Sequence, residues 1–267
     1  MYNLAAMIIT KNEEIHIQRC INSVIDHVDA VFVIDSGSID KTTIIAEKLG
    51  AVILKNKWTG YSNQINWAIK KISPLSKWIL RIDADEIIEK NGQFIKNYIK
   101  NINPDINGIT IKRNMYFDGD LVRYGGVYNR KILRIFRSGY GFCDNKLMDE
   151  HIVVKPKIID SKFVFCDKNL NGFNHFISKH IRYAELESKA NLNLNNLPGF
   201  QYSSNTNNIR LLKKNIFMKI NPRLRPFLYL FYRLILRGGI LDKDKAYYFH
   251  IFQSFFYRSM VEYKKLK

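Results

Sequence analysis

The stretch that decides the fold reads Trp78-Ile79-Leu80-Arg81-Ile82-Asp83-Ala84-Asp85-Glu86. Its first part is rich in β-branched and aromatic residues, which predicts a buried strand with three acids at its carboxyl end. Ligands of open α/β sheets bind at that end of the strands. Acids held this close raise each other's pKa unless a cation neutralises them, and Mg²⁺ or Mn²⁺ suits such oxygen ligands. A solvated turn, with Asp85 or Glu86 capping a helix, is the alternative that this stretch alone leaves open.

Strands and helices alternate before this stretch. Apolar, strand-like runs cover residues 4–9, 30–34 and 51–54. Helix-forming segments follow the three runs and are expected at residues 17–25, 40–49 and 61–72. This order predicts an α/β fold whose sheet is mostly parallel and flanked by helices.

Polar side chains follow the predicted strands where each strand ends. They are Thr10, Asn12 and Glu13 after the first, Asp35 and Ser36 after the second, and Asp83 and Asp85 after the fourth. The carboxyl ends of parallel strands meet at one edge of a sheet, so the sequence predicts a nucleotide pocket there. The first turn has neither a G-x-G-x-x-G nor a P-loop pattern, which disfavours those two kinds of nucleotide site. Each side chain, taken singly, could instead cap a turn.

The pattern changes after residue 103 to shorter strand-like segments separated by loops rich in glycine and aromatic residues. A helix over 92–102 is expected to precede these segments, which lie at 108–112, 131–136 and 152–154. Such loops suit an acceptor-binding half. Asp149, Glu150 and His151 form a second compact acid cluster just before the last segment, where a carboxylate could face the nucleotide pocket. A surface turn is the alternative reading of this cluster.

The charge of the chain is unevenly distributed. Its net charge is +18, and residues 201–267 hold 14 Lys and Arg against 3 Asp and Glu. A basic tail indicates an anionic partner, for which nucleic acid and an anionic membrane both qualify. Three cysteines without paired spacing argue against a disulfide framework or a zinc site and favour a reducing compartment. No export signal is evident at the start, so we expect a cytoplasmic protein.

Two apolar segments are expected to form helices in the tail, after an Asn-rich linker at 191–208. Residues 227–236 are apolar except for Arg233 and fall well short of the ~20 residues that a membrane-spanning helix needs. Residues 245–264 carry many aromatic side chains with basic residues near both ends. We therefore expect residues 222–267 to lie on an anionic membrane surface. The alternative is that these helices pack on the catalytic domain or form a homodimer.

Four motifs together resemble the family-2 glycosyltransferases, which are inverting enzymes of the GT-A fold that use nucleotide sugars. The motifs lie at residues 9–14, 33–42, 61–68 and 78–86. Residues 149–151, 179–187 and 225–257 further resemble a bacterial subgroup that builds lipopolysaccharide, capsule or exopolysaccharide. One departure is Ile39, where the family usually has threonine.

The resemblance implies a role for each candidate site residue. Thr10, Glu13 and Asp35 would contact the nucleoside, expected to be uridine, with further polar contacts from Asn12, Ser36, Gln64 and Asn66. Asp83 would contact the ribose or the metal, and Asp85 would bind the Mn²⁺ or Mg²⁺ that bridges the diphosphate. Glu150 would be the general base, with Asp149 as the fallback and His151 as an additional metal or phosphate contact.

The resemblance also implies an organisation and a function. Residues 1–200 would form a GT-A catalytic domain, with a nucleotide-sugar half at 1–103 and an acceptor half at 104–200, and 201–267 would form an amphipathic helical appendage. The enzyme would transfer a hexose from a UDP-sugar to a lipid-linked or lipopolysaccharide acceptor in a single displacement. It would act at the cytoplasmic face of the inner membrane.

Two other functions are considered. A nucleotidyltransferase acting on a sugar phosphate also needs acids and a divalent ion, but the first turn is acidic where a glycine-rich, basic triphosphate loop would be expected. A basic nucleic-acid-binding protein would fit the charge, yet the sequence has no helix-turn-helix, zinc or RNA-binding signature. We therefore expect no nucleic-acid partner.

Overall fold

The computed structural model describes residues 1–89, 94–145, 150–189, 217 and 219–266. These residues form two compact units that alternate along the chain. The first unit contains the described residues of Met1–Arg113 and Lys131–Asp167, and the second contains those of Asn114–Arg130, Lys168–Asn196 and Asn205–Lys267. The predicted boundary at residue 200 and the predicted linker at 191–208 lie outside the described residues.

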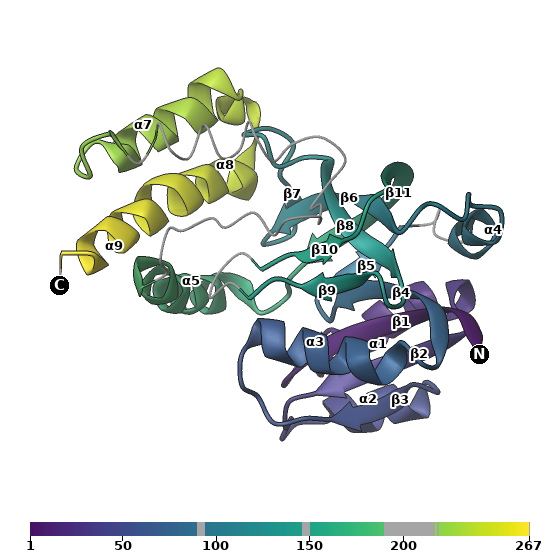
Figure 1. The fold of residues 1–267 in the computed structure, drawn as a ribbon. Coiled ribbons are helices and arrows are strands. Elements are labelled where there is room, and N and C mark those ends of the chain that lie inside the picture. Colours follow the sequence, from purple (N-terminus) through teal and green to yellow (C-terminus); the bar gives the residue numbers. More distant parts are fainter. Residues whose placement is uncertain (90–93, 146–149, 190–216, 218, 267) are drawn as a thin grey trace. The chain divides into compact units, whose positions relative to one another are not determined.

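Half of the sheet of the first unit is parallel (Figure 1). Its strands are paired in the order β3-β2-β1-β4 and comprise β1 (Tyr2–Thr10), β2 (Ala30–Asp35), β3 (Val52–Lys55) and β4 (Ser76–Asp83). The helices between them are α1 (Ile17–Val24), α2 (Thr42–Lys48) and α3 (Tyr61–Ile72), with a short 3-10 turn, η1 (Ile25–His27), after α1. The predicted strands and helices of this half are therefore confirmed.

The other half of the sheet brings in antiparallel pairs. It continues from β4 through β8 (Arg130–Arg137), β6 (Gly108–Phe117), β11 (Ile158–Lys168) and β5 (Glu86–Ile88). The pairs β4–β8 and β11–β5 are antiparallel, so the sheet as a whole is mixed and its parallel character is confined to the first four strands. The strands β5 and β11 were not predicted from the sequence. A separate two-stranded sheet joins β9 (Gly141–Cys143) to β10 (Ile152–Val154), and α4 (Ile95–Lys100) lies within the predicted helix over 92–102.

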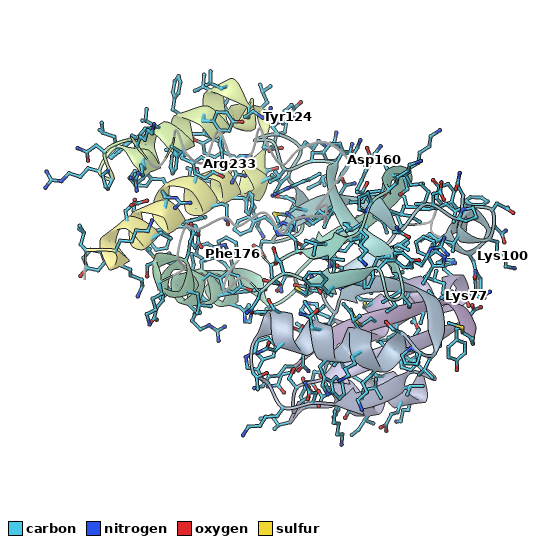
Figure 2. All side chains as sticks on the ribbon, viewed as in Figure 1. Lys77, Lys100, Tyr124, Asp160, Phe176 and Arg233 are labelled. Atoms are coloured by element: carbon cyan, nitrogen blue, oxygen red, sulfur yellow. The ribbon has the colours of Figure 1, made fainter. Side chains whose placement is uncertain are left out.

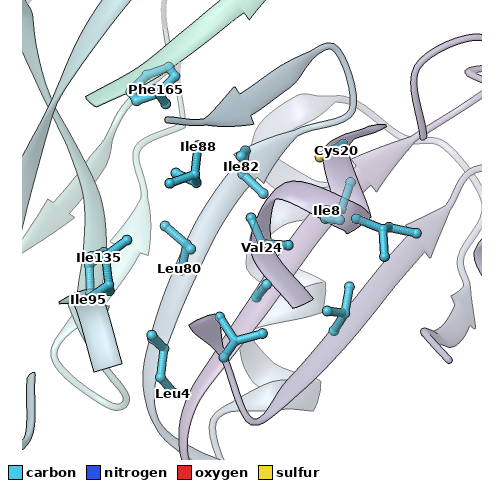
Figure 3. Packing of buried hydrophobic residues seen from close by; sticks show 14 of the residues in the cluster. Leu4, Ile8, Cys20, Val24, Leu80, Ile82, Ile88, Ile95, Ile135 and Phe165 are labelled. Carbon is cyan, nitrogen blue, oxygen red and sulfur yellow. The ribbon is translucent and has the colours of Figure 1, made fainter. Parts of the chain in front are cut away.

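The core of the first unit has two layers, one on each face of the sheet. Side chains of β1 alternate between them, because Leu4 and Ile8 belong to one hydrophobic cluster and Met7 to the other. The first layer includes residues of α1, α2 and α4, and Figure 3 shows part of it around Leu80. The second layer includes the inner face of α3. The sheet is thus buried on both faces, and its polar strand ends are left for ligands.

The second unit is mainly helical. Its elements are β7 (Asp120–Leu121), which pairs with the end of β6, α5 (Gly172–Lys189), α7 (Arg225–Phe231), η3 (Tyr232–Leu236), η4 (Gly239–Leu241), α8 (Asp244–His250), η5 (Ile251–Phe256) and α9 (Tyr257–Lys264). Phe117, Phe176 and Phe249 meet in an aromatic cluster, in which the ring centroids of Phe176 and Phe249 lie 4.8 and 5.5 Å from that of Phe117. Figure 2 labels Phe176 of this cluster. The buried Val261 packs in a second cluster with Tyr257, whose hydroxyl donates to Glu187 at 2.5 Å.

The two predicted tail helices are present, but their surroundings differ. The predicted helix over 245–264 corresponds to α8, η5 and α9, which contribute the buried Phe249 and Val261 to the core of the unit. The predicted segment 227–236 corresponds to most of α7 and to η3, where several large apolar side chains are exposed. No helix among the described residues is both long enough and apolar enough to cross a membrane.

Candidate functional site

Three polar strand ends lie side by side in the first unit. Thr10 of β1 is in register with Asp35 of β2, and Ile9, one residue earlier, is in register with Asp83 of β4. The predicted meeting of these strand ends is therefore observed. Because all three strands run parallel, their carboxyl ends form one edge, which is where α/β sheets bind ligands.

Thr10 and Asp35 are both buried at this edge, but only one of them is satisfied internally. The Asp35 carboxylate accepts hydrogen bonds from the backbone N–H groups of Gly37 and Ser38, at 3.0 and 3.1 Å, and from the Ser38 hydroxyl at 2.5 Å. It therefore caps its own turn, as the sequence alternative allowed. The Oγ1 atom of Thr10 is buried, and within the described residues it has no hydrogen-bond partner. A buried hydroxyl of this kind is suited to a ligand that supplies the missing bond.

The loops after β1 and β2 are bound to each other. The N–H of Asn12 donates to the Ser38 hydroxyl at 2.9 Å, and the Asn12 side-chain oxygen accepts from the N–H of Ile39 at 2.9 Å. Glu13 places its carboxylate 2.5 Å from the Nδ1 atom of the buried His16. Both loops therefore present a fixed surface beside Thr10.

Gln64 and Asn66 of α3 are tied to neighbouring backbone and side chains. Gln64 is buried and accepts a hydrogen bond from the Asn56 amide at 2.7 Å, and its own amide lies 3.4 Å from the Ser36 hydroxyl. The side chain of Asn66 both donates to and accepts from the backbone of Cys143, at 2.9 and 2.8 Å. These contacts fix α3 against its neighbours, and direct contact with a donor stays a prediction for both residues.

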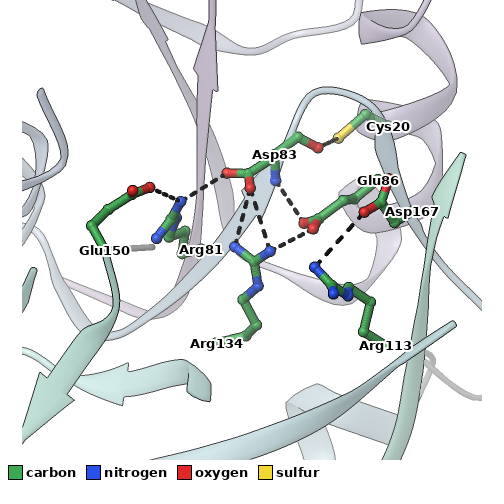
Figure 4. Close-up of polar contacts among 8 residues, drawn as sticks. All are labelled: Cys20, Arg81, Asp83, Glu86, Arg113, Arg134, Glu150 and Asp167. Carbon is green, nitrogen blue, oxygen red and sulfur yellow. Dashed lines mark hydrogen bonds and ion pairs between the residues drawn. The ribbon is translucent and has the colours of Figure 1, made fainter. Parts of the chain in front are cut away.

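Two buried arginines hold the acids that end β4 (Figure 4). Asp83 lies between them, with one carboxylate oxygen 3.4 Å from Arg81 and the other 3.3 Å from Arg134. Arg134 also pairs with Glu86, whose second oxygen accepts the backbone N–H of Asp83 at 2.9 Å. The acids therefore share positive charge supplied by the protein itself.

The same cluster extends to the candidate base. Glu150 places a carboxylate oxygen 3.6 Å from Arg81, and its side chain is 16% exposed, so it is accessible while being held (Figure 4). Arg81 thus contacts both Asp83 and Glu150, which are 67 positions apart in the sequence. The fallback base, Asp149, lies outside the described residues. His151 pairs through its backbone with Asp144, at 2.8 and 2.9 Å, and its predicted role as a ligand stays a prediction.

Burial and charge shift the pKa values of this cluster in predictable directions. Burial lowers the pKa of Arg81, but the carboxylates of Asp83 and Glu150 outweigh it and leave the net pKa raised. Burial raises the pKa of Glu86, Arg134 opposes this shift, and Asp83 adds to it, so that the net pKa is raised. Arg81 is therefore a permanent cation, and Arg134 keeps the pKa of Glu86 lower than burial alone would make it.

Neither buried arginine was among the site residues predicted from the sequence. Each lies inside a strand-forming run, Arg81 between Leu80 and Ile82, and Arg134 between Leu133 and Ile135. Arginine is almost never buried without a partner. A charged residue in the middle of a predicted buried strand was therefore the signal that could have identified them.

Asp85 is the predicted ligand of a divalent cation, and its backbone carbonyl oxygen accepts a hydrogen bond from Arg19 at 3.3 Å. It is half-buried and follows Asp83, which two guanidinium groups already neutralise. Within the described residues, no group of three or more Asp, Glu, His or Cys side chains is arranged to hold a metal ion. Mg²⁺ in nucleotide sites commonly takes one or two carboxylates plus phosphate oxygens. The donor set around Asp85 fits a cation bound in that way.

Replacing Arg134 is predicted to enlarge the dependence of folding stability on pH that the raised pKa of Glu86 already causes. Without the guanidinium, the pKa of Glu86 rises further, and the folded protein retains a proton that the unfolded chain loses near its usual value of 4.5. The folded state then binds more protons between the two pKa values, so the free energy of unfolding falls as pH rises through that window. We expect Arg134→Met to cost about 3–5 kcal/mol near pH 9 and less near pH 6, measured by urea unfolding.

Two further variants test this prediction. Glu86→Gln in the Arg134→Met background should remove the pH dependence that Arg134→Met adds, because the titrating group is gone. Arg223→Met, at an exposed position, is the matched control and should leave stability nearly unchanged. If the free energy of unfolding of the double variant depends on pH as strongly as that of Arg134→Met, the assignment to Glu86 is wrong.

Comparison with known proteins adds a family to this geometry. The sequence profile described as Glycosyl transferase family 2 matches residues 6–153, which include the carboxyl end of β1, all of β2 to β4, and Glu150. An uncharacterized glycosyltransferase of Rickettsia bellii is 48% identical over 96 residues, which are 36% of this chain and 32% of that protein. The lipopolysaccharide core biosynthesis glycosyltransferase LpsC of Rhizobium meliloti is 30% identical over 146 residues, or 53% of each chain.

The matches cover less than two thirds of these relatives: about a third of the Rickettsia protein and about half of LpsC. Among solved structures, glucosyl-3-phosphoglycerate synthase from Mycobacterium tuberculosis, in complex with Mn²⁺, UDP and glucosyl-3-phosphoglycerate, aligns with a TM-score of 0.36 and 21% identity. It covers 43% of this chain and 44% of that one. Since the family profile matches more than half of the sequence and contains the strand ends described above, the chain belongs to glycosyl transferase family 2.

Proposed function

We propose that this protein is a metal-dependent, inverting glycosyltransferase that transfers a hexose from a UDP-sugar to a lipid-linked or lipopolysaccharide acceptor. The observation that carries the proposal is the charged cluster in which Arg81 contacts both Asp83, at the nucleotide edge of the sheet, and Glu150. Through Arg81, the residue proposed to contact the donor, Asp83, would be connected to the residue proposed to activate the acceptor, Glu150.

The donor would bind along the strand ends. The unsatisfied hydroxyl of Thr10 and the fixed loop at Asn12 and Glu13 would contact the nucleoside, and Asp83 the ribose. Asp85, with the donor's diphosphate, would hold Mn²⁺ or Mg²⁺. The bound cation would supply stabilisation of the negative charge that develops on the departing diphosphate.

Glu150 would act as the general base. Inversion in one step needs one carboxylate on the side of the sugar opposite the leaving group, where it takes the proton of the acceptor hydroxyl. The partial exposure of Glu150 lets an acceptor reach it, and the contact with Arg81 restricts its orientation. Restricting a catalytic carboxylate in this way lowers the entropic cost of reaching the reactive geometry.

The acceptor would be met at a membrane. Eight large apolar side chains, from the residue before α7 to the end of η4, are each 45–66% exposed. We call them the apolar strip: Leu224, Phe227, Leu228, Phe231, Ile235, Leu236, Ile240 and Leu241. The first five follow helical spacing, and exposed basic residues, including Arg223 and Arg237, accompany the strip. Such a surface suits an anionic bilayer, in this proposal the cytoplasmic face of the inner membrane.

Replacing Asp85 is predicted to weaken metal binding. We expect Asp85→Asn to bind Mn²⁺ in the presence of UDP roughly tenfold or more weakly, because losing an outer-shell partner alone costs about that much. Electron paramagnetic resonance of free Mn²⁺ measures this without turnover. Asp26→Asn, at an exposed position, is the control. Equal Mn²⁺ affinity in Asp85→Asn and wild type would exclude the metal role.

Replacing Glu150 is predicted to slow the reaction while leaving nucleotide binding intact. The donor is first identified by incubating the protein with a panel of UDP-sugars and Mn²⁺ and measuring the release of UDP. Hydrolysis of the donor by water needs no acceptor. We then expect Glu150→Gln to lower kcat for transfer to acceptors in a membrane extract by about 10²–10⁴-fold, with the Kd for UDP unchanged. The control is Glu47→Gln, at an exposed position. Full turnover of Glu150→Gln would remove it as the base.

Substitutions in the apolar strip are predicted to release the protein from vesicles. Because α8 and α9 contribute to the core, surface changes test membrane binding better than deletion of the tail. The triple change Phe227→Ser, Phe231→Ser and Ile235→Ser should weaken partitioning onto anionic vesicles by roughly a hundredfold. The control changes three exposed apolar residues of the first unit to serine: Ile39, Ile44 and Leu75. If both triple variants partition like wild type, the apolar strip is not the membrane surface.

A further inference from the structure

The second unit contains a pocket that the proposed chemistry does not use. It has a volume of about 360 Å³, it is open to solvent, and it is lined by Arg123, Tyr124, Gly126, Tyr128, Leu236 and Arg237. All six residues belong to the second unit, and none belongs to the charged cluster at the strand ends. Its volume lies at the small end of the range of ligand sites, which suits a compact polar group.

The loop that forms one side of this pocket is fixed from behind by a buried carboxylate. The two oxygens of Asp242 accept the backbone N–H groups of Arg123 and Tyr124, each at 3.0 Å. One of them also lies 2.8 Å from the Nε2 atom of the buried His250. The N–H of Gly125 donates to the carbonyl oxygen of Arg237 at 3.0 Å, which joins the two sides of the pocket.

Two glycines in this loop allow its close approach. Gly125 has a φ of +66°, and a Cβ atom there would lie 2.3 Å from the His250 ring. Gly126 has a φ of +77°, and a Cβ atom there would lie 2.9 Å from the Nε atom of Arg237. The guanidinium of Arg237 therefore packs directly on the loop backbone, on the pocket that Arg123 also lines.

The polar groups in the pocket wall are mainly donors. Arg123 and Arg237 are exposed, and neither has an ion-pair partner within the part of the chain that the structure describes. Tyr124 and Tyr128 add phenolic hydroxyl groups (Figure 2 labels Tyr124). Two guanidinium groups with hydroxyl donors match the oxygens of a phosphate, which arginine binds through two parallel hydrogen bonds.

The pocket is continuous with the apolar strip. Leu236 belongs to both, is 66% exposed and directly precedes Arg237. A ligand with its phosphate in the pocket would therefore have an apolar surface beside it. We propose that this pocket binds the phosphate group of a lipid-linked acceptor at the bilayer surface. The inference rests on the proposed function, because it names the part of the acceptor that the enzyme holds.

Vesicle binding without nucleotide tests this site. Phosphatidylcholine vesicles are doped with phosphatidic acid, which exposes a phosphate monoester, or with phosphatidylserine at equal surface charge. We expect the wild type to bind the phosphatidic acid vesicles about tenfold more tightly, and Arg123→Gln with Arg237→Gln to lose that preference. The same loss is expected for the lysine pair, Arg123→Lys with Arg237→Lys, because an ammonium group cannot form the forked contact.

The control pair loses the same charge elsewhere on the second unit, through Arg182→Gln with Lys243→Gln, both at exposed positions. It should keep the preference for phosphatidic acid. Equal losses in the control and pocket variants, or full preference in the lysine pair, would overturn the proposal. The proposal would also be overturned if the free protein bound inorganic pyrophosphate as tightly as it binds the phosphatidic acid vesicles, because the pocket would then be a site for a soluble phosphate. Donor hydrolysis is not part of this assay, so a failure here is separable from a failure of the proposed function.

Discussion

The pairing of two buried guanidinium groups with the acids that end β4 is the interaction on which the rest of the first unit depends. Asp83, Asp85 and Glu86 occupy four consecutive positions with one alanine, and the burial of Glu86 makes their mutual repulsion costly. Arg81 and Arg134 supply compensating charge within 3.4 Å of Asp83. A buried ion pair adds little net stability against an apolar pair of the same shape, but losing one partner is expensive. The cluster is therefore better explained by the site than by stability.

This interaction also explains why the antiparallel half of the sheet belongs to the site. β8 pairs with β4 so that Leu80 faces Ile135, and this register places Arg134, the preceding residue, beside the end of β4. Arg81 makes a different connection. Its guanidinium contacts both Asp83 and Glu150, and Glu150 lies in the segment before β10. The parallel half supplies the polar strand ends and Arg81, while the antiparallel half supplies Arg134, the second charge that allows acids to lie there.

The parallel half of the sheet could largely be predicted from the sequence, whereas its contacts with the antiparallel half could not. The helix predicted over 61–72 matches α3, and the polar ends of β1, β2 and β4 were located, because periodicity and turn residues are local signals. The contact between Arg134 and Asp83 spans 51 positions, and no local pattern encodes it. β11 was missed although it has 11 residues, because it mixes polar and apolar side chains as a mixed sheet permits. Asp35 shows a further limit, since its type fitted both a ligand contact and the turn cap that the structure displays.

Beside the pocket of the second unit, a buried charge acts in the opposite way. In the first unit, buried arginines hold acids in place, whereas in the second a buried acid, Asp242, holds a loop that carries arginine. Burial lowers the pKa of His250, and although Asp242 raises it, Arg233 adds to the lowering, so the imidazole is held neutral. A neutral His250 adds no positive charge beside Asp242, whose carboxylate accepts the two backbone N–H groups of the loop, lies 2.8 Å from the Nε2 atom of His250 and is attracted by Arg233. Asp242 therefore forms its hydrogen bonds on the buried side of the loop and does not pair with Arg123 or Arg237. The guanidinium groups of these two arginines are left to line the solvent-facing pocket.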